Sequence, residues 1–134
     1  MKLNIISLPS PDVKHILSSE NNSNTNYYKY YWKFKSKYLI SLEIDGNTID
    51  ITIPEKFESD GGTIPRIFGY FRGLAFRGYF VHDFLYTNHI YSRKMADEIL
   101  RECLKYEGVS CIDRNIIYLV VRLFGSKHYK TKGE

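Results

Sequence analysis

The sequence is poor in cysteine and has no long hydrophobic run. Only Cys103 and Cys111 occur among the 134 residues, too few for the disulfide framework of a small secreted domain. Charged residues interrupt every apolar stretch, which argues against a helix that spans a membrane. The first 20 residues soon turn polar, so no secretion signal is expected. These absences favour an intracellular chain with two reduced thiols.

Large apolar side chains and a small excess of positive charge are what the sequence does contain. The 12 tyrosines and 8 phenylalanines indicate one globular domain rather than a disordered chain. The net charge of +4 helps any encounter with phosphate-rich partners without requiring one. Nucleic-acid binding is the least favoured class, since the lysines between the aromatic residues of segment 28–38 fit the wet face of an edge strand.

Hydrophobic periodicity divides the chain into a β half and an α half. The polar run LSSENNSNTN at 17–26 predicts a flexible lead-in over residues 1–26, a single domain over 27–126 and a basic tail over 127–134. Alternation of apolar and polar residues from Tyr28 to Ile44, a break near Ser36, the turn DGN at 45–47 and further alternation to Ile53 predict an antiparallel meander of about three strands.

Three helices are expected after the meander. The first covers about 74–87, the second begins after the N-cap Ser92 and ends near Gly108, and the third begins after Ser110 and ends at Gly125. On the third helix, a polar stripe of Arg114, Tyr118 and Arg122 is expected to face solvent, opposite an apolar face of Ile112, Ile116, Val120 and Leu123. The predicted fold class is α+β, a short N-terminal antiparallel meander followed by three helices.

The first helix is apolar on most of its circumference and carries one polar arc of His82, Tyr86, Tyr79 and Asp83. A buried carboxylate or imidazole needs a partner, and Asp97 on the second helix is a candidate. Asp97 could bind one ring nitrogen of His82 and leave the other free to accept a proton from water. Asp83 would then be able to bind a hard cation with oxygen ligands from the glycine-rich segment before the helix.

A structural interpretation of the same residues stays open beside the catalytic one. A His–Asp pair on a central helix also serves as a buried polar network that fixes how two helices pack. Asp97 could be only a surface pair with Arg101, four residues on. The other histidines lack partners at ligand spacing, so no zinc site is expected.

Several motifs together resemble a small uncharacterised family encoded by bacteriophages and prophages. They are FESDGGTIPRIF, GYFVHDFLY, SRKMADEILRECLKYEGV and RLFG, which match the family's Asp-Gly-(Ala/Gly)-Ser/Thr-Ile-Pro-Arg, His-Asp-x-Leu-Tyr and Ala-Asp motifs over about residues 48–125. The resemblance implies a phage or prophage origin, a place in the host-cell cytoplasm or the phage particle, and no established activity. The matching positions are Asp60, Gly61, Thr63, Ile64, Pro65, Arg66, His82, Asp83, Tyr86, Arg93, Ala96 and Asp97.

The pattern His82-Asp83-x-x-Tyr86 with a later acid is also similar to the helix pair of phospholipase A2. That resemblance implies that His82 activates water, that Asp83 holds calcium or another divalent cation, and that Asp97 and Tyr86 orient the histidine. Asp60, Gly61, Gly62 and Thr63 would complete the calcium shell and the oxyanion site. The implied activity is a metal-assisted hydrolase acting on a lipid or another ester.

The alternative is a phage protein with no catalytic activity, either a virion component or a factor that binds and inhibits a host protein. Residues 60–66 would then form a structural clasp. Gly61 and Gly62 would adopt backbone angles that other residues resist, Pro65 would start a helix, and Arg66 would pair with a buried acid such as Asp83. The sequence does not indicate the oligomeric state.

Overall fold

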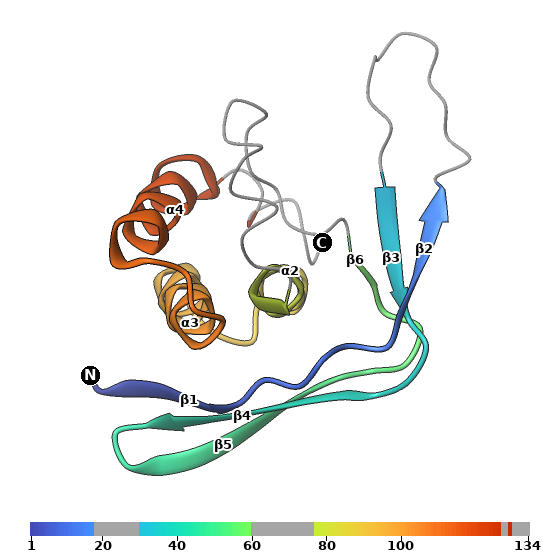
Figure 1. Ribbon diagram of the computed structural model, residues 1–134, viewed down its shortest axis with the longest axis horizontal. Coiled ribbons are helices and arrows are strands. Elements are labelled where there is room, and N and C mark those ends of the chain that lie inside the picture. Colours follow the sequence, from blue (N-terminus) through green and yellow to red (C-terminus); the bar gives the residue numbers. More distant parts are fainter. Residues whose placement is uncertain (18–29, 60–76, 127–128, 130–134) are drawn as a thin grey trace, which may run out of the picture.

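The computed structural model describes residues 1–17, 30–59, 77–126 and 129. Antiparallel strands in two small sheets come first, and three helices follow (Figure 1). The α+β fold class expected from the sequence is confirmed. In the part of the chain that is described, no helix is long and apolar enough to cross a membrane.

Within the described residues, six strands form the two sheets, three in each. The first sheet has the order β1-β4-β5 and the second the order β2-β3-β6, with every pair antiparallel. The strands are β1 (Leu3–Ser7), β2 (Val13–Leu17), β3 (Tyr30–Phe34), β4 (Tyr38–Ile44), β5 (Asn47–Ile53) and β6 (Glu58–Ser59).

The expected single meander is only partly correct. Its hairpin of β4 and β5 is confirmed, with Asp45 and Gly46 at positive φ values of 50° and 84° in the turn. The break near Ser36 is also confirmed, but β3 does not pair with β4. The Phe34 amide donates instead to the Phe57 carbonyl at 2.9 Å, which directs β3 into the second sheet.

The flexible lead-in expected over residues 1–26 is wrong for its first part. Strand β1 pairs with β4, Ile5 opposite Leu42, and β2 pairs with β3. Leu8, between the two strands, is only 1% exposed. The partners of these strands lie far along the chain, so a local pattern could not reveal them. Residues 18–26 lie outside the described residues.

The helices begin and end close to the expected residues. They are α2 (Arg77–Asn88), α3 (Arg93–Tyr106) and α4 (Cys111–Phe124). The Ser92 side chain accepts from the Met95 amide and the Ser110 side chain from the Asp113 amide, both at 3.2 Å. Both predicted N-caps are therefore confirmed.

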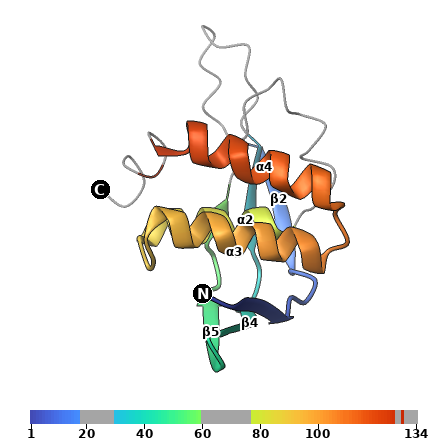
Figure 2. The same ribbon diagram turned by 90° about the vertical axis from the view of Figure 1, so that its left-hand side faces the viewer.

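Helix α2 lies at the centre of the molecule, between the sheets and the other two helices (Figure 1). All nine residues of 78–86 are buried, as the apolar circumference predicted. One apolar cluster joins α2 and one face of α3 to the sheets, while a second joins α2 and α3 to α4. Figure 2 shows α3 and α4 side by side in front of the sheets.

The buried face of helix α4 shares only Val120 with the face expected from the sequence. Ile112 and Leu123 are 74% and 65% exposed, whereas Ile117, Val120 and Val121 are buried against α2 and α3. Arg122, which the sequence assigned to a solvated stripe, reaches towards α3. The apolar residues at helical spacing did not predict the buried face, because Ile112, Ile116 and Leu123 are exposed.

Candidate functional site

The site lies where α2 and α3 pack closely together. The two helices are joined by the short connection 89–92 and approach closely at Gly78, where an added Cβ would lie 3.0 Å from the Cβ of Cys103. Glu107, at the end of α3, accepts from the first two amides of α2, those of Arg77 and Gly78. This capping fixes α2 along α3 and places His82 opposite Asp97.

Asp97 is the centre of the site. Its side chain is completely buried. Its Oδ1 lies 2.7 Å from His82 Nε2 and accepts from the Tyr86 hydroxyl at 2.5 Å. The rings of His82 and Tyr86 also pack together, with centroids 4.1 Å apart. The predicted grouping of His82, Tyr86 and Asp97 is thus present in the structure.

The second carboxylate oxygen of Asp97 faces two arginines. Arg122 of α4 donates from Nη1 to Oδ2 at 2.9 Å, and Nη1 of Arg93 lies 3.6 Å from the same atom. Nη1 of Arg93 also donates to the carbonyls of Val121 and Arg122. Arg93 was among the predicted site residues, whereas Arg122 was not. Asp97 therefore joins α2, α3 and α4.

These contacts determine the charge of Asp97. Burial alone would raise the pKa of its carboxyl, but hydrogen bonds from His82, Tyr86 and Arg122, together with the charge of His82, outweigh burial and lower the pKa below the ordinary 3.8. Burial and the bond to Asp97 raise the pKa of Tyr86. Near neutral pH the site consequently holds an ionised carboxylate and a protonated phenol.

The ionised carboxylate fixes the tautomer of His82. A carboxylate without a proton can only accept hydrogen bonds, so the Nε2 atom of His82 must carry the proton that it shares with Asp97. In the neutral ring, Nδ1 then carries the lone pair, and it makes no hydrogen bond within the described part of the chain. An imidazole held in this way is suited to take a proton at Nδ1.

The C-terminal end of α4 also contacts the site. An added Cβ on Gly125 would lie 2.7 Å from the Tyr86 hydroxyl and 2.4 Å from the Val121 carbonyl oxygen, so a larger side chain does not fit. Tyr129 packs edge-to-face on Tyr86, with ring centroids 5.1 Å apart. The RLFG motif, which contains Arg122 and Gly125, was the available signal for these contacts.

Of the remaining predicted site residues, the structure describes Asp83 and Tyr79 but not those of segment 60–66. Asp83 follows His82 on α2 and is 4% exposed. Tyr79 is buried in the cluster that joins α2 and α3 to α4, with Leu100 and Ile117. The predictions on Asp60, Gly61, Gly62, Thr63, Pro65 and Arg66 fall outside the described residues.

The described residues alone do not make a calcium site. Across residues 1–17, 30–59 and 77–126, no group of three or more histidine, cysteine, aspartate or glutamate side chains could hold a metal. Asp83 supplies one carboxylate, whereas calcium takes six to eight oxygen ligands. No chemical step is therefore assigned to a metal here.

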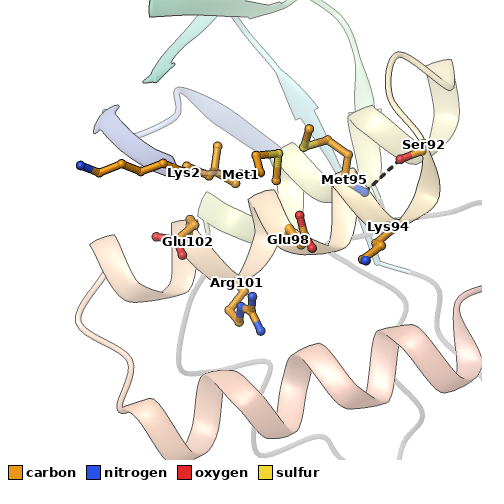
Figure 3. Close-up of a pocket in the computed structure, with 9 residues that line it drawn as sticks. Met1, Lys2, Ser92, Lys94, Met95, Glu98, Arg101 and Glu102 are labelled. Carbon is orange, nitrogen blue, oxygen red and sulfur yellow. Dashed lines mark hydrogen bonds between the residues drawn. The ribbon is translucent and has the colours of Figure 1, made fainter. Parts of the chain in front are cut away.

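A pocket of about 630 Å³ lies elsewhere, on the outer side of α3 (Figure 3). It is formed by the start of the chain and by side chains of both charges on α3, among them Lys94, Glu98 and Arg101. Neither His82 nor Asp97 lines it. The pocket is therefore separate from the His–Asp pair.

The lowered pKa of Asp97 predicts how the site responds to acid. Because the folded-state pKa lies below the unfolded value, the ionised carboxylate stabilises the fold above pH of about 4, and this contribution is lost as the pH falls through the folded-state pKa. We expect the difference in unfolding free energy between the wild type and Asp97→Asn to shrink as the pH is lowered from 6 to about 3. Urea unfolding across that range measures it, and a constant difference would contradict the expectation.

Comparison with known proteins assigns most of the chain to one protein family. A family model described as "Protein of unknown function (DUF1353)" matches residues 32–121, about two thirds of the chain. The match includes β4, β5, α2, α3 and most of α4, with His82, Tyr86, Arg93 and Asp97. Neither the curated proteins nor the solved structures contain a match. The chain belongs to the DUF1353 family.

Proposed function

We propose that the protein is a hydrolase in which His82 is the general base for attack of water on an ester. The observation that carries the proposal is the 2.7 Å contact of His82 Nε2 with an ionised, fully buried Asp97. This contact leaves Nδ1 of His82 as the proton acceptor. Tyr86 and Arg122 hold the carboxylate in place through one oxygen each, so the imidazole keeps one orientation.

The proposed reaction follows from this geometry. Nδ1 of His82 takes a proton from water while the water oxygen bonds to the acyl carbon of the ester and the π electrons of the carbonyl move onto its oxygen. The resulting imidazolium is stabilised by the negative charge of Asp97. The carbonyl double bond then re-forms, the bond between the acyl carbon and the alcohol oxygen breaks, and the proton passes from His82 to that oxygen. The products are a carboxylic acid and an alcohol, and the substrate is a lipid or another ester.

A divalent cation at Asp83 belongs to the same proposal. Asp83 adjoins His82 on α2, and a carboxylate is a ligand that calcium prefers. Its proposed co-ligand Asp60 lies outside the described residues. If a cation binds, the melting temperature should rise as calcium is added to the wild type, and Asp83→Asn should abolish that rise.

A second candidate function is non-enzymatic, and one observation favours it. Asp97 links three helices, and the side chain of His82 is only 9% exposed, as a structural network would require. Under this proposal the protein is a virion component or a factor that binds a host protein. A phage or prophage origin, with a place in the host cytoplasm or the particle, is part of both proposals.

Hydrolysis of a panel of nitrophenyl esters with short and long acyl chains tests the first proposal. We expect His82→Gln to lower kcat/KM by about 10²–10⁴, the usual contribution of a general base, with the melting temperature measured in parallel. His89→Gln is the matched control, because His89 is exposed and contacts Tyr129 rather than Asp97. Equal rates for the wild type and His82→Gln would leave the non-enzymatic function.

A further inference from the structure

The outward side of α4 carries an apolar stripe that the proposed hydrolase does not use. The stripe consists of Ile112, Ile116, Leu119 and Leu123, which are 74%, 37%, 57% and 65% exposed. At about 100° per residue, the four side chains fall within an arc of about 60°. Figures 1 and 2 show α4 as an outer helix of the three described helices, and the exposed fractions place this arc at the surface.

The spacing of the stripe is that of a helix–helix seam. Successive members are four, three and four residues apart, the spacing of a and d positions in paired helices. The stripe also contains no charged residue that pairing would have to bury. Its natural complement is therefore another helix with the same apolar spacing, and a second α4 has it.

The pairing geometry of two copies can be derived from the stripe. A two-fold axis between Ile116 and Leu119 sets two α4 helices antiparallel, with Ile112 of one copy against Leu123 of the second copy. Ile116 then meets Leu119 of the second copy, so every exposed member of the stripe is covered in one interface. The antiparallel arrangement also brings opposite ends of the helix dipoles together.

The area of the stripe indicates the strength of the association. The exposed parts of its four side chains amount to roughly 400 Å², within the range of the largest apolar patches on monomeric proteins. Two copies bury roughly 800 Å² from the stripes and more from flanking residues, near the lower limit of about 1,000 Å² for a specific interface. An association of this size is weak and depends on concentration.

We infer that the protein forms a weak two-fold dimer in solution through the α4 stripe. The inference does not depend on the proposed hydrolase, since the four residues belong to neither of the two buried clusters of the described structure. It assigns to α4 two separate roles on two sides. The inner side supplies Arg122 to the site, and the outer side holds the second copy.

Sedimentation equilibrium of the full chain tests the dimer. Between about 5 µM and 1 mM, a range that covers the dissociation constants of weak interfaces, the average mass should rise from 15.8 kDa towards twice that value. Leu119→Glu should keep the protein monomeric, because pairing would bury a charge against Ile116 of the second copy. Leu119→Asn, a milder change, should reduce association at least tenfold.

The control variant is Leu39→Glu, since Leu39 is an exposed leucine of β4 that lies outside the stripe (50% exposed). It should associate as the wild type does, and circular dichroism should confirm that all variants fold. The dimer is overturned by a wild type that stays monomeric at 1 mM, or by a Leu119→Asn variant that associates as strongly as the wild type. It is also overturned if the stripe variants lose only binding to anionic lipid vesicles, which would make a membrane surface the partner.

Discussion

Asp97→Asn is expected to lower the unfolding free energy by about 3 kcal/mol or more, since breaking a buried ion pair leaves uncompensated charge. The amide keeps the size of the carboxylate, but it has only one acceptor oxygen for donors that now approach from both sides. If the amide oxygen stays with His82 and Tyr86, the amide nitrogen faces Arg122. It then occupies the position where Oδ2 of the wild-type Asp97 accepts from Arg122 at 2.9 Å. Two donors then oppose each other beside a side chain that is completely buried.

The same variant is expected to lower ester hydrolysis by about 10⁴, the loss in kcat when an orienting aspartate becomes asparagine in a hydrolytic triad. Urea unfolding and the nitrophenyl ester assay measure the two effects. Glu98→Gln is the matched control: it removes one negative charge from the next position of α3, on a half-buried side chain that lines the outer pocket. It should change stability by less than about 0.5 kcal/mol. Equal losses in the two variants would contradict a central role for Asp97.

Arg122→Gln is expected to lower the unfolding free energy by about 2 kcal/mol. This value is below the cost of breaking a fully buried pair, because the arginine side chain is 29% exposed and partly screened by solvent. Arg93 remains near Oδ2 but at 3.6 Å. With one fewer donor, the Asp97 carboxylate can rotate, and the His82 ring that it binds then moves. A misplacement of about 1 Å lowers the rate of hydrolysis by about 10²-fold.

The matched control for Arg122→Gln is Arg114→Gln on the same helix. Arg114 donates to the carbonyl of Val109 at 3.2 Å and is not among the described partners of Asp97. It should therefore retain the hydrolysis rate. Arg122→Lys should restore part of the activity, since it keeps the charge but not the planar fork of donors. If Arg114→Gln reduced hydrolysis as strongly as Arg122→Gln, the effect would come from α4 packing alone.

The sequence predicted those parts of the site that depend on helical periodicity. His82 and Tyr86 are one turn apart on a helix that is buried on all sides, and Asp97 comes early in the next helix after a short connection. These facts are local, and they sufficed to bring the three side chains together. Arg122 depends on which face of α4 packs inward, and there the apolar pattern was misleading, because Ile112, Ile116 and Leu123 are exposed.

The same distinction explains the β half. The hairpin of β4 and β5 follows from strict alternation and the turn at Asp45 and Gly46, both local signals. The strands β1 and β2 are short and pair with residues 13 to 41 positions away, and no local signal records such a partner. Long-range pairing therefore decided the division into two sheets, and periodicity could not.

The most direct test of the account is the protonation of the two ring nitrogens of His82, measured by ¹⁵N NMR of histidine-labelled protein. The ionised Asp97 predicts, for the neutral ring, a proton on Nε2 and an unprotonated Nδ1 with the chemical shift of a free lone pair. Asp97→Asn is expected to change that shift. A neutral His82 with its proton on Nδ1 would contradict the account, because Asp97 could then not be the acceptor that orients the ring.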